Sequence, residues 1–167
     1  MRCLFVMDKI GRNPFPARQS DLFFDKSITI STIVLMKITT DTNTFLATAL
    51  NEPEKQAIIN LTCDHELIAP TILPFEIGNA LSAMVKRGRL TRQEGLLAYD
   101  ETDKIPVELH SIDIRRALTI AGQYKIYAYD AYFLECARAT RSPLLTLDAA
   151  LKTIAVKLGI KLLEVES

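Results

Sequence analysis

The 167-residue sequence lacks the features of a secreted, membrane-spanning or disulfide-stapled protein. Its longest apolar run, residues 28–38, is interrupted by polar residues and is far shorter than the ~20 residues that a spanning helix needs. The N-terminus has no apolar stretch of the roughly 7–15 residues typical of a secretory signal. Three cysteines, Cys3, Cys63 and Cys136, lie far apart and predict neither a disulfide framework nor a paired-cysteine metal site. These absences favour a cytoplasmic location with no membrane partner.

An excess of charge of one sign is also missing. Twenty Lys and Arg residues cancel twenty Asp and Glu residues, so the chain has no strong electrostatic footprint for nucleic acid. Apolar residues make up 49% of the chain and charged residues 24%, which is ordinary for a folded protein and excludes global disorder. The length fits one domain, or one domain with a tail.

The first 35 residues differ from the rest of the chain. Residues 11–20 contain two prolines, a glycine and two arginines without a usable apolar period, which indicates a loop or disorder. From Met36 the pattern becomes regular. We therefore expect residues 1–35 to be an N-terminal extension and residues 36–167 to be the folded domain. Two alternatives stay open for the extension: either Met36 is the true translation start, or the segment is an arm that packs on the domain or on a partner.

After this boundary, strand-like and helix-like segments alternate. Strands are predicted at 32–40, 66–69, 107–112, 144–147 and 161–165. Helices are predicted at 43–50, 52–61, 72–87, 92–103, 114–124, 130–140 and 149–158, with Thr71 and Thr91 as N-caps of the third and fourth. This alternation is typical of βαβ units, so the predicted fold class is α/β, with a central parallel sheet flanked by helices in three layers.

Several catalytic motifs are absent. The chain has no GxGxxG, GxxxxGK[ST], GxSxG or HExxH motif. His65 and His110 each lack a second histidine, cysteine or carboxylate at ligand spacing. Dinucleotide enzymes, P-loop NTPases, serine hydrolases and zinc proteases therefore lose support.

What remains is a set of four carboxylates in particular places. Asp41 and Asp148 each follow a predicted strand, Asp130 lies where a predicted helix begins, and Glu76 interrupts an apolar stretch of a helix. Each has an ordinary alternative: a turn or helix cap for the aspartates, and an ion pair or contact with water for Glu76. In an open parallel sheet, however, ligands bind outside the carboxyl ends of the strands, so we expect all four to gather at one edge.

Carboxylates gathered in this way repel one another, and a bound divalent cation is the natural way to neutralise them. A site of oxygen ligands without histidine or cysteine selects a hard ion, Mg²⁺ or Mn²⁺. Such an ion activates water and stabilises charge that develops at phosphorus. The sequence therefore indicates a metal site suited to phosphate chemistry.

Four segments together resemble PIN-domain ribonucleases, most closely the VapC-type toxins of toxin–antitoxin pairs. The matching segments are residues 41–43 (DTN), 74–81 (PFEIGNAL), 129–137 (YDAYFLECA) and 143–151 (PLLTLDAAL). The resemblance implies a compact α/β domain, a Mg²⁺- or Mn²⁺-dependent endoribonuclease, and a small antitoxin partner. It does not cover residues 1–35. Tyr129 departs from the small or polar residue found in many relatives, and we expect this departure to affect substrate fit rather than metal binding.

The resemblance also implies roles for individual residues. Asp41 and Asp130 would be direct metal ligands, Asp148 a ligand or a near neighbour, and Glu76 would hold a metal-bound water or orient the attacking one. Asn43 and Thr146 would support these groups from behind. The expected products carry 5′-phosphate and 3′-hydroxyl ends, because the 2′-hydroxyl of the RNA is not the nucleophile.

Basic residues are candidates for contact with the RNA backbone, although solvated helix faces explain them as well. The candidates are Lys86, Arg87, Arg89, Arg92, Arg115, Arg116, Arg138 and Arg141. An antitoxin is expected to lay a C-terminal segment across the acidic site with an Arg or Lys reaching the carboxylates. The apolar stretch 95–99 is surplus to one core and predicts a homodimer.

Two other functions stay open at this point. A haloacid-dehalogenase-type phosphatase also places an Asp after the first strand, but that chemistry needs a second Asp two residues later, where this chain has Asn43. A catalytically silent PIN-like binding module would need no intact acidic set, whereas this chain keeps all four carboxylates.

Overall fold

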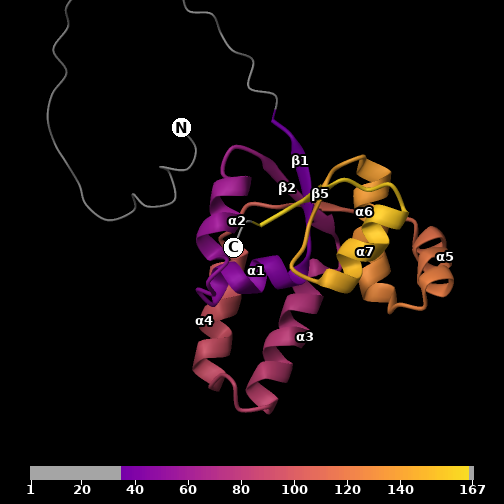
Figure 1. Ribbon diagram of the computed structural model, residues 1–167. Helices are drawn as coiled ribbons and strands as arrows, with labels where there is room; N and C mark the ends of the chain where they lie inside the picture. The colour runs from indigo at the N-terminus through magenta and orange to yellow at the C-terminus, as the bar shows by residue number, and fades with distance from the viewer. Residues whose placement is uncertain (1–34, 166–167) are drawn as a thin grey trace, which may run out of the picture.

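A computed structural model describes residues 35–165 and shows a five-stranded, all-parallel sheet with helices on both faces (Figure 1). The strands are β1 (Lys37–Thr40), β2 (Glu66–Pro70), β3 (Glu108–His110), β4 (Leu144–Leu145) and β5 (Leu162–Leu163). The helices are α1 (Thr42–Ala49), α2 (Lys55–Thr62), α3 (Leu73–Lys86), α4 (Arg92–Asp103), α5 (Ile114–Tyr124), α6 (Ala128–Thr140) and α7 (Ala149–Lys157). The predicted α/β class is confirmed. The expectations about residues 1–34 lie outside the described residues.

The strand order is β3-β2-β1-β4-β5, with every neighbouring pair parallel. The chain therefore winds outward from β1 in one direction through β2 and β3, and in the other through β4 and β5. Thr40 of β1 is paired with Leu145 of β4. The carboxyl ends of β1 and β4 form the point where the winding direction reverses, which is where open α/β sheets bind ligands.

Strand alternation divides the core between the two faces of the sheet. Leu144 packs with α5, α6 and α7 on one face, whereas Leu145 packs with Ile38, α1 and α2 on the other. These side chains are all buried. The predicted three layers are thus confirmed, with α1 and α2 on the opposite side of the sheet from α6 and α7 (Figure 1).

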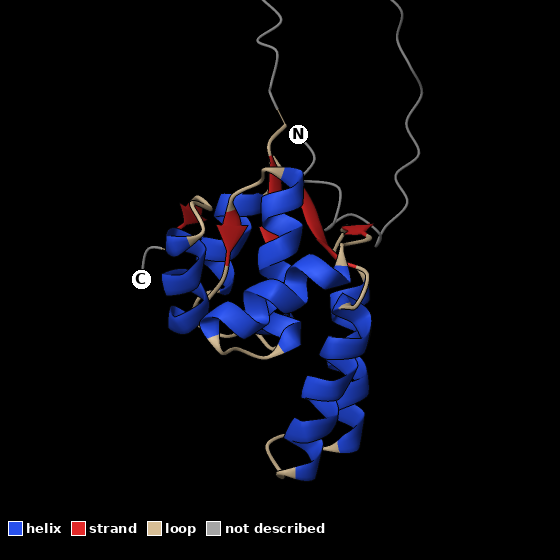
Figure 2. Ribbon diagram, turned by 90° about the vertical axis from the view of Figure 1, so that its right-hand side faces the viewer, coloured by secondary structure: helices blue, strands red, loops and turns tan. Residues whose placement is uncertain are grey.

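Helices α3 and α4 form a hairpin that projects from the body of the domain (Figure 2). Thr91 and Glu94 form the predicted capping box at the start of α4. Gly95 lets the two helices come close, because a Cβ added there would lie 3.0 Å from Cγ2 of Val85. None of the helices within residues 35–165 is long and apolar enough to cross a bilayer.

Some predicted boundaries are wrong. Thr71 does not cap α3: the N-cap position is Ile72 without a side-chain cap, and the Thr71 N–H donates to the carbonyl of His110, which extends the pairing of β2 with β3. Helix α6 begins at Ala128 rather than at Asp130, with Tyr127 at its N-cap. The strands predicted at 107–112, 144–147 and 161–165 are shorter in the structure, at Glu108–His110, Leu144–Leu145 and Leu162–Leu163.

Candidate active site

Asp41 lies directly after β1, where it is only 4% exposed. Its Oδ1 accepts hydrogen bonds from the Thr44 N–H at 3.0 Å and the Thr44 hydroxyl at 2.7 Å, so Asp41 is the N-cap of α1. Its Oδ2 accepts a short hydrogen bond from the hydroxyl of Thr146. Burial raises the pKa of Asp41, these hydrogen bonds oppose the rise, and the nearby charge of Asp148 adds to it. Asp41 is thus a fixed, buried carboxylate.

Asp148 lies beyond the neighbouring strand β4 and is half-buried. Its Oδ1 accepts from the N–H groups of Ala150 at 2.7 Å and Leu151 at 3.0 Å, which makes it the N-cap of α7. The ordinary alternative of a helix cap is therefore true of both Asp41 and Asp148. Both capping hydrogen bonds of Asp148 go to its Oδ1, so its Oδ2 stays available to a ligand.

Asp130 lies in the first turn of α6 and does not cap it. No residue among those described donates a hydrogen bond to its carboxylate or forms an ion pair with it. Burial raises the pKa of Asp130, and the charges of Asp148 and Asp41 raise it further. A half-buried carboxylate that only meets other carboxylates is costly unless a cation completes the site.

Glu76 lies in the first turn of α3. Its Oε2 is buried and has no hydrogen-bond partner within the described chain. Burial raises the pKa of Glu76, and the charges of Asp130 and Asp41 add to the effect. The hydroxyl of Thr42 lies near enough to oppose the rise, although it makes no well-formed hydrogen bond. The alternative of an ion pair for Glu76 is wrong, since no cationic side chain of residues 35–165 reaches it.

The four carboxylates gather as expected at the edge where β1, β2 and β4 end. The charges of Asp148 and Asp41 raise the pKa of Asp130, and the charges of Asp130 and Asp41 raise the pKa of Glu76. Within residues 35–165 no three His, Cys, Asp or Glu side chains form a compact, ready-made metal cage. The donor chemistry nevertheless fits a hard divalent cation, because every candidate ligand is an oxygen and one of these oxygens is buried without a partner. Burial raises the pKa of Asp41, Glu76 and Asp130, and the neighbouring carboxylate charges add to the rise.

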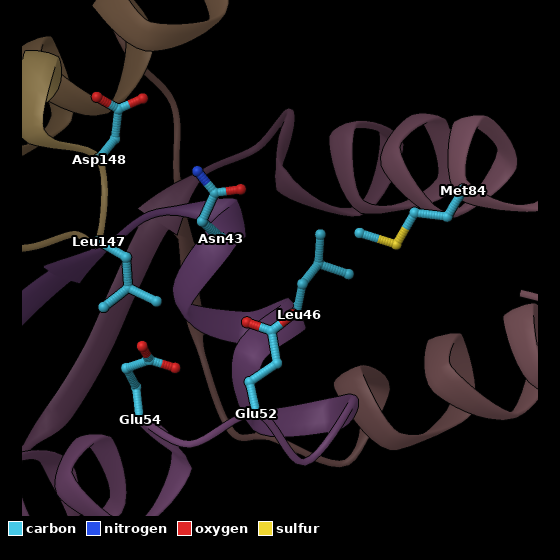
Figure 3. A pocket seen from close by; sticks show the side chains of 7 residues that line it. All are labelled: Asn43, Leu46, Glu52, Glu54, Met84, Leu147 and Asp148. Atoms are coloured by element: carbon cyan, nitrogen blue, oxygen red, sulfur yellow. The ribbon is translucent and has the colours of Figure 1, made fainter. Parts of the chain in front are cut away.

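A pocket of about 320 Å³ opens beside Asp148 (Figure 3). Its walls come from α1, the turn that follows α1, α3 and the end of β4: Asn43, Leu46, Glu52, Glu54, Met84, Leu147 and Asp148. Asn43 is exposed there and forms no hydrogen bond with any of the four carboxylates. Its expected supporting role stays a prediction, whereas Thr146 does contact Asp41.

The basic candidates lie apart from the carboxylates. Arg87, Arg89 and Arg92 are exposed at the turn between α3 and α4, at the far end of the projecting hairpin. With a rise of about 1.5 Å per residue, the end of α3 lies about 15 Å beyond Glu76. Arg138 forms an ion pair with the buried Glu135 at 2.8 Å, so it is less suited to RNA.

Two features of the site were not singled out from the sequence. Thr44 binds Asp41 with both its N–H and its hydroxyl. A signal existed, because a hydroxyl residue three positions after an aspartate N-cap is well placed to do so. Glu54 faces the pocket, and nothing in its local sequence distinguishes it from a surface glutamate.

An acidic site at the switch point of a parallel three-layer sheet is typical of α/β proteins that bind ligands at the carboxyl ends of their strands. The PIN domain family matches residues 38–157 of this chain, and the chain belongs to that family. No curated protein sequence gives a match.

Two solved structures are similar in fold. PAE2754 from Pyrobaculum aerophilum aligns with a TM-score of 0.55 and 19% identity over 74% of this chain and 90% of that one. VapBC2 from Rickettsia felis, bound to a DNA fragment from their promoter, aligns with a TM-score of 0.54 and 14% identity, over 77% and 98% of the two chains. At these identities the likeness shows a shared fold.

Proposed function

We propose that this chain is a metal-dependent endoribonuclease that hydrolyses phosphodiester bonds of RNA in the cytoplasm, as the toxin of a toxin–antitoxin pair. The observation that carries the proposal is the position of Asp130 and Glu76. In this PIN domain both carboxylates lie at the sheet edge beside Asp41 and Asp148, and no side chain of residues 35–165 forms an ion pair with either of them.

Asp41, Asp130 and Asp148 are the residues that would hold Mg²⁺ or Mn²⁺. When bound, the ion supplies an activated water and neutralises charge that develops on the phosphate. The carboxylate of Asp41 is already oriented to bind the ion, because Thr44 and Thr146 each donate a hydrogen bond to one of its two oxygens. Asp148 is oriented by its hydrogen bonds to the start of α7.

The chain's own acid–base group is Glu76. A carboxylate whose pKa is raised by burial is better matched to proton transfer near neutral pH. Glu76 takes the proton of the attacking water, and the water oxygen bonds to phosphorus opposite the 3′-oxygen. The bond from phosphorus to that 3′-oxygen breaks, and the leaving oxygen takes a proton from solvent water. One product then carries a 5′-phosphate and the other a 3′-hydroxyl.

Arg87, Arg89 and Arg92 would hold the RNA backbone at a distance from the cut, from the tip of the hairpin. Tyr127 is 84% exposed near Asp130, so its ring can stack on a base. Tyr129 is 48% exposed and makes an edge-to-face contact with Tyr132, with ring centroids 5.9 Å apart. The exposed surface therefore offers both phosphate and base contacts.

An antitoxin and a second copy of the chain are the proposed protein partners. The similarity in fold to VapBC2 supports the former. A cationic side chain from its C-terminal segment would replace the metal as the partner of the carboxylates. For a homodimer, Leu96 and Leu97 are 61% and 57% exposed on α4, while Gly95 and Ala98 pack inward. Sedimentation as a monomer at micromolar concentration would overturn the homodimer.

The test is RNA cleavage by the full chain beside variants of the site and a surface control. Asp130→Asn and Glu76→Gln should each lose cleavage of end-labelled RNA, while Glu101→Gln, which removes only a surface ion pair with Lys104, should keep it. Cleavage that survives Asp130→Asn and Asp41→Asn would point to the silent binding module instead. The match to the PIN domain leaves the phosphatase alternative without support.

A further inference from the structure

The pocket beside Asp148 has a mixed lining, and apart from Asp148 the cleavage chemistry does not use these residues (Figure 3). We infer that it binds a guanine base of the RNA, and that Glu54 reads the Watson–Crick edge of this base. The inference rests on the proposed ribonuclease function and deepens it, because it names a base that the site selects.

The turn after α1 places two glutamates at this pocket. Asn51 adopts a left-handed conformation with φ 58°, which asparagine tolerates better than most residues. The Glu52 N–H then donates to the carbonyl of Ala47 at 2.9 Å, which closes the end of α1. The chain reverses there, so Glu52 and Glu54 extend toward Asn43 and Leu147 (Figure 3).

Three polar side chains of the pocket, those of Glu52, Glu54 and Asn43, have no structural role. Glu54 occupies the N-cap position of α2 but makes no capping hydrogen bond with its side chain. Within residues 35–165, the side chains of Glu52, Glu54 and Asn43 form no hydrogen bond or ion pair. Glu54 is half-buried, whereas Glu52 is exposed at the rim. Both carboxylate oxygens of Glu54 are therefore available to accept hydrogen bonds from a ligand.

The remaining walls suit a flat, apolar face. Leu46, Met84 and Leu147 contribute aliphatic and thioether surface. The volume of about 320 Å³ lies at the lower end of the roughly 300–1,000 Å³ of small-ligand sites. Proteins that read single-stranded RNA stack a splayed base on such surface and bond its edge with side chains.

The charge of the pocket decides which base it takes. An ionised carboxylate only accepts hydrogen bonds, and its two oxygens accept in parallel. Guanine presents two adjacent donors on its Watson–Crick edge, N1–H and the N2 amino group. Adenine and cytosine present a donor next to an acceptor, and uracil presents one donor between two acceptors. The same negative charge repels phosphates, so the backbone stays outside.

Continuity with the cleavage site favours RNA over a cationic peptide as the occupant. Asp148 lines the pocket and also belongs to the carboxylate group. The nucleotide next to the cut phosphate can therefore place its base in the pocket, with no further nucleotide between them. Asn43, on the same wall, offers an amide that can meet the guanine O6 acceptor.

The test profiles cleavage sites in a randomised single-stranded RNA pool with the full chain. Guanine should be preferred at one fixed position next to the cut, and Glu54→Gln should reduce that preference by about tenfold, the effect of removing one bidentate hydrogen-bonded pair to a base. Inosine, which lacks the N2 amino group, should be disfavoured at that position, whereas 7-deazaguanine, which keeps the same edge, should be accepted. Glu101→Gln is the matched control and should leave the profile unchanged.

Binding of the same RNAs in chelator keeps the two proposals apart. Cleavage without a base preference, or with one that Glu54→Gln does not change, would overturn the guanine pocket and leave the ribonuclease standing. No cleavage, together with guanine-selective binding that Glu54→Gln abolishes, would support the pocket and overturn the nuclease. Equal binding of guanine- and inosine-containing RNA would overturn the pocket, as would a Glu54→Gln variant that weakens only the binding of an antitoxin.

Discussion

The hydroxyl of Thr146 donates a hydrogen bond to Oδ2 of Asp41, although the two residues lie 105 positions apart. The parallel pairing of Thr40 with Leu145 brings them side by side, because each is the next residue beyond a paired strand. The same hydroxyl oxygen accepts the Asp148 N–H at 3.0 Å. One fully buried side chain thus links two of the four carboxylates.

Replacement of Thr146 by valine should damage both stability and activity. Valine keeps the shape but leaves Asp41 Oδ2 and the Asp148 N–H without this partner, a loss of about 1–3 kcal/mol in the free energy of unfolding. RNA cleavage should fall by about 10–100-fold, as for other groups that orient metal ligands. Thr146→Ser keeps the hydroxyl and should keep most of the activity. Equal activity of the valine and serine variants would show that this bond has no role.

The pH dependence of stability should reveal the repulsion within the site. Burial, and then neighbouring charge, raise the pKa of Asp41, Glu76 and Asp130 above 3.8 or 4.5, the ordinary values of Asp and Glu. The folded protein therefore binds protons more tightly than the unfolded chain. In chelator, the stabilisation is complete below about pH 4 and is lost as the pH rises through the raised pKa values.

Asp130→Asn isolates this effect. In chelator, its Tm should exceed that of the natural protein near pH 7 and approach it near pH 4. Added Mn²⁺ should raise the Tm of the natural protein near pH 7 and have little effect on the variant. The lowered pKa values of the exposed Glu94 and Glu108 act in the opposite direction, but they are common to both proteins. A pH-independent difference in Tm would contradict the repulsion.

The central strands β1 and β4 were predictable because they carry buried β-branched or apolar residues, whereas β3 is short and largely exposed. Capping chemistry marked the start of α4 correctly, since Thr91 and Glu94 satisfy each other locally. At the start of α3 the same reasoning failed, because the Thr71 N–H donates a hydrogen bond to the carbonyl of His110 on the neighbouring strand β3. Local chemistry cannot predict a boundary that a distant strand decides.

Gly95 should tolerate a larger side chain poorly. A Cβ there would lie 3.0 Å from Val85, so Gly95→Val should cost about 1–3 kcal/mol in the free energy of unfolding. Gly122 in α5 has nothing within 4 Å of an added Cβ, and Gly122→Ala should stabilise by up to about 1 kcal/mol. Urea denaturation measures both, and equal midpoints would show that α3 and α4 can separate without cost.

The hairpin tip should act on RNA affinity rather than on the chemistry. Replacement of Arg87, Arg89 and Arg92 by alanine should weaken RNA binding and reduce the slope of log affinity against log salt by about 2, at roughly 0.7 for each phosphate that no longer meets a cation. Arg115→Ala with Arg116→Ala, on α5, is the comparable removal of charge elsewhere on the domain. A larger effect of the α5 pair, measured by anisotropy over a salt series, would move the RNA path to that side.

The site itself was predictable in part. The positions of Asp41 and Asp148 after two strands, together with parallel topology, were enough to bring them to one edge. The start of α6 was misplaced by two residues, so the sequence could not show that Asp130 lies inside the helix and is free of capping. Glu54 was not predictable, because its place at the pocket depends on the left-handed turn at Asn51.

Analysis of product ends with and without a chelator tests the central claim most directly. The full chain is incubated with end-labelled RNA in Mg²⁺ or Mn²⁺, beside the Asp130→Asn variant. We expect cuts that carry 5′-phosphate and 3′-hydroxyl ends and that disappear both in chelator and in the variant. Products with 2′,3′-cyclic phosphates, or cutting that persists in chelator and in the variant, would contradict a metal-dependent hydrolytic site built on these four carboxylates.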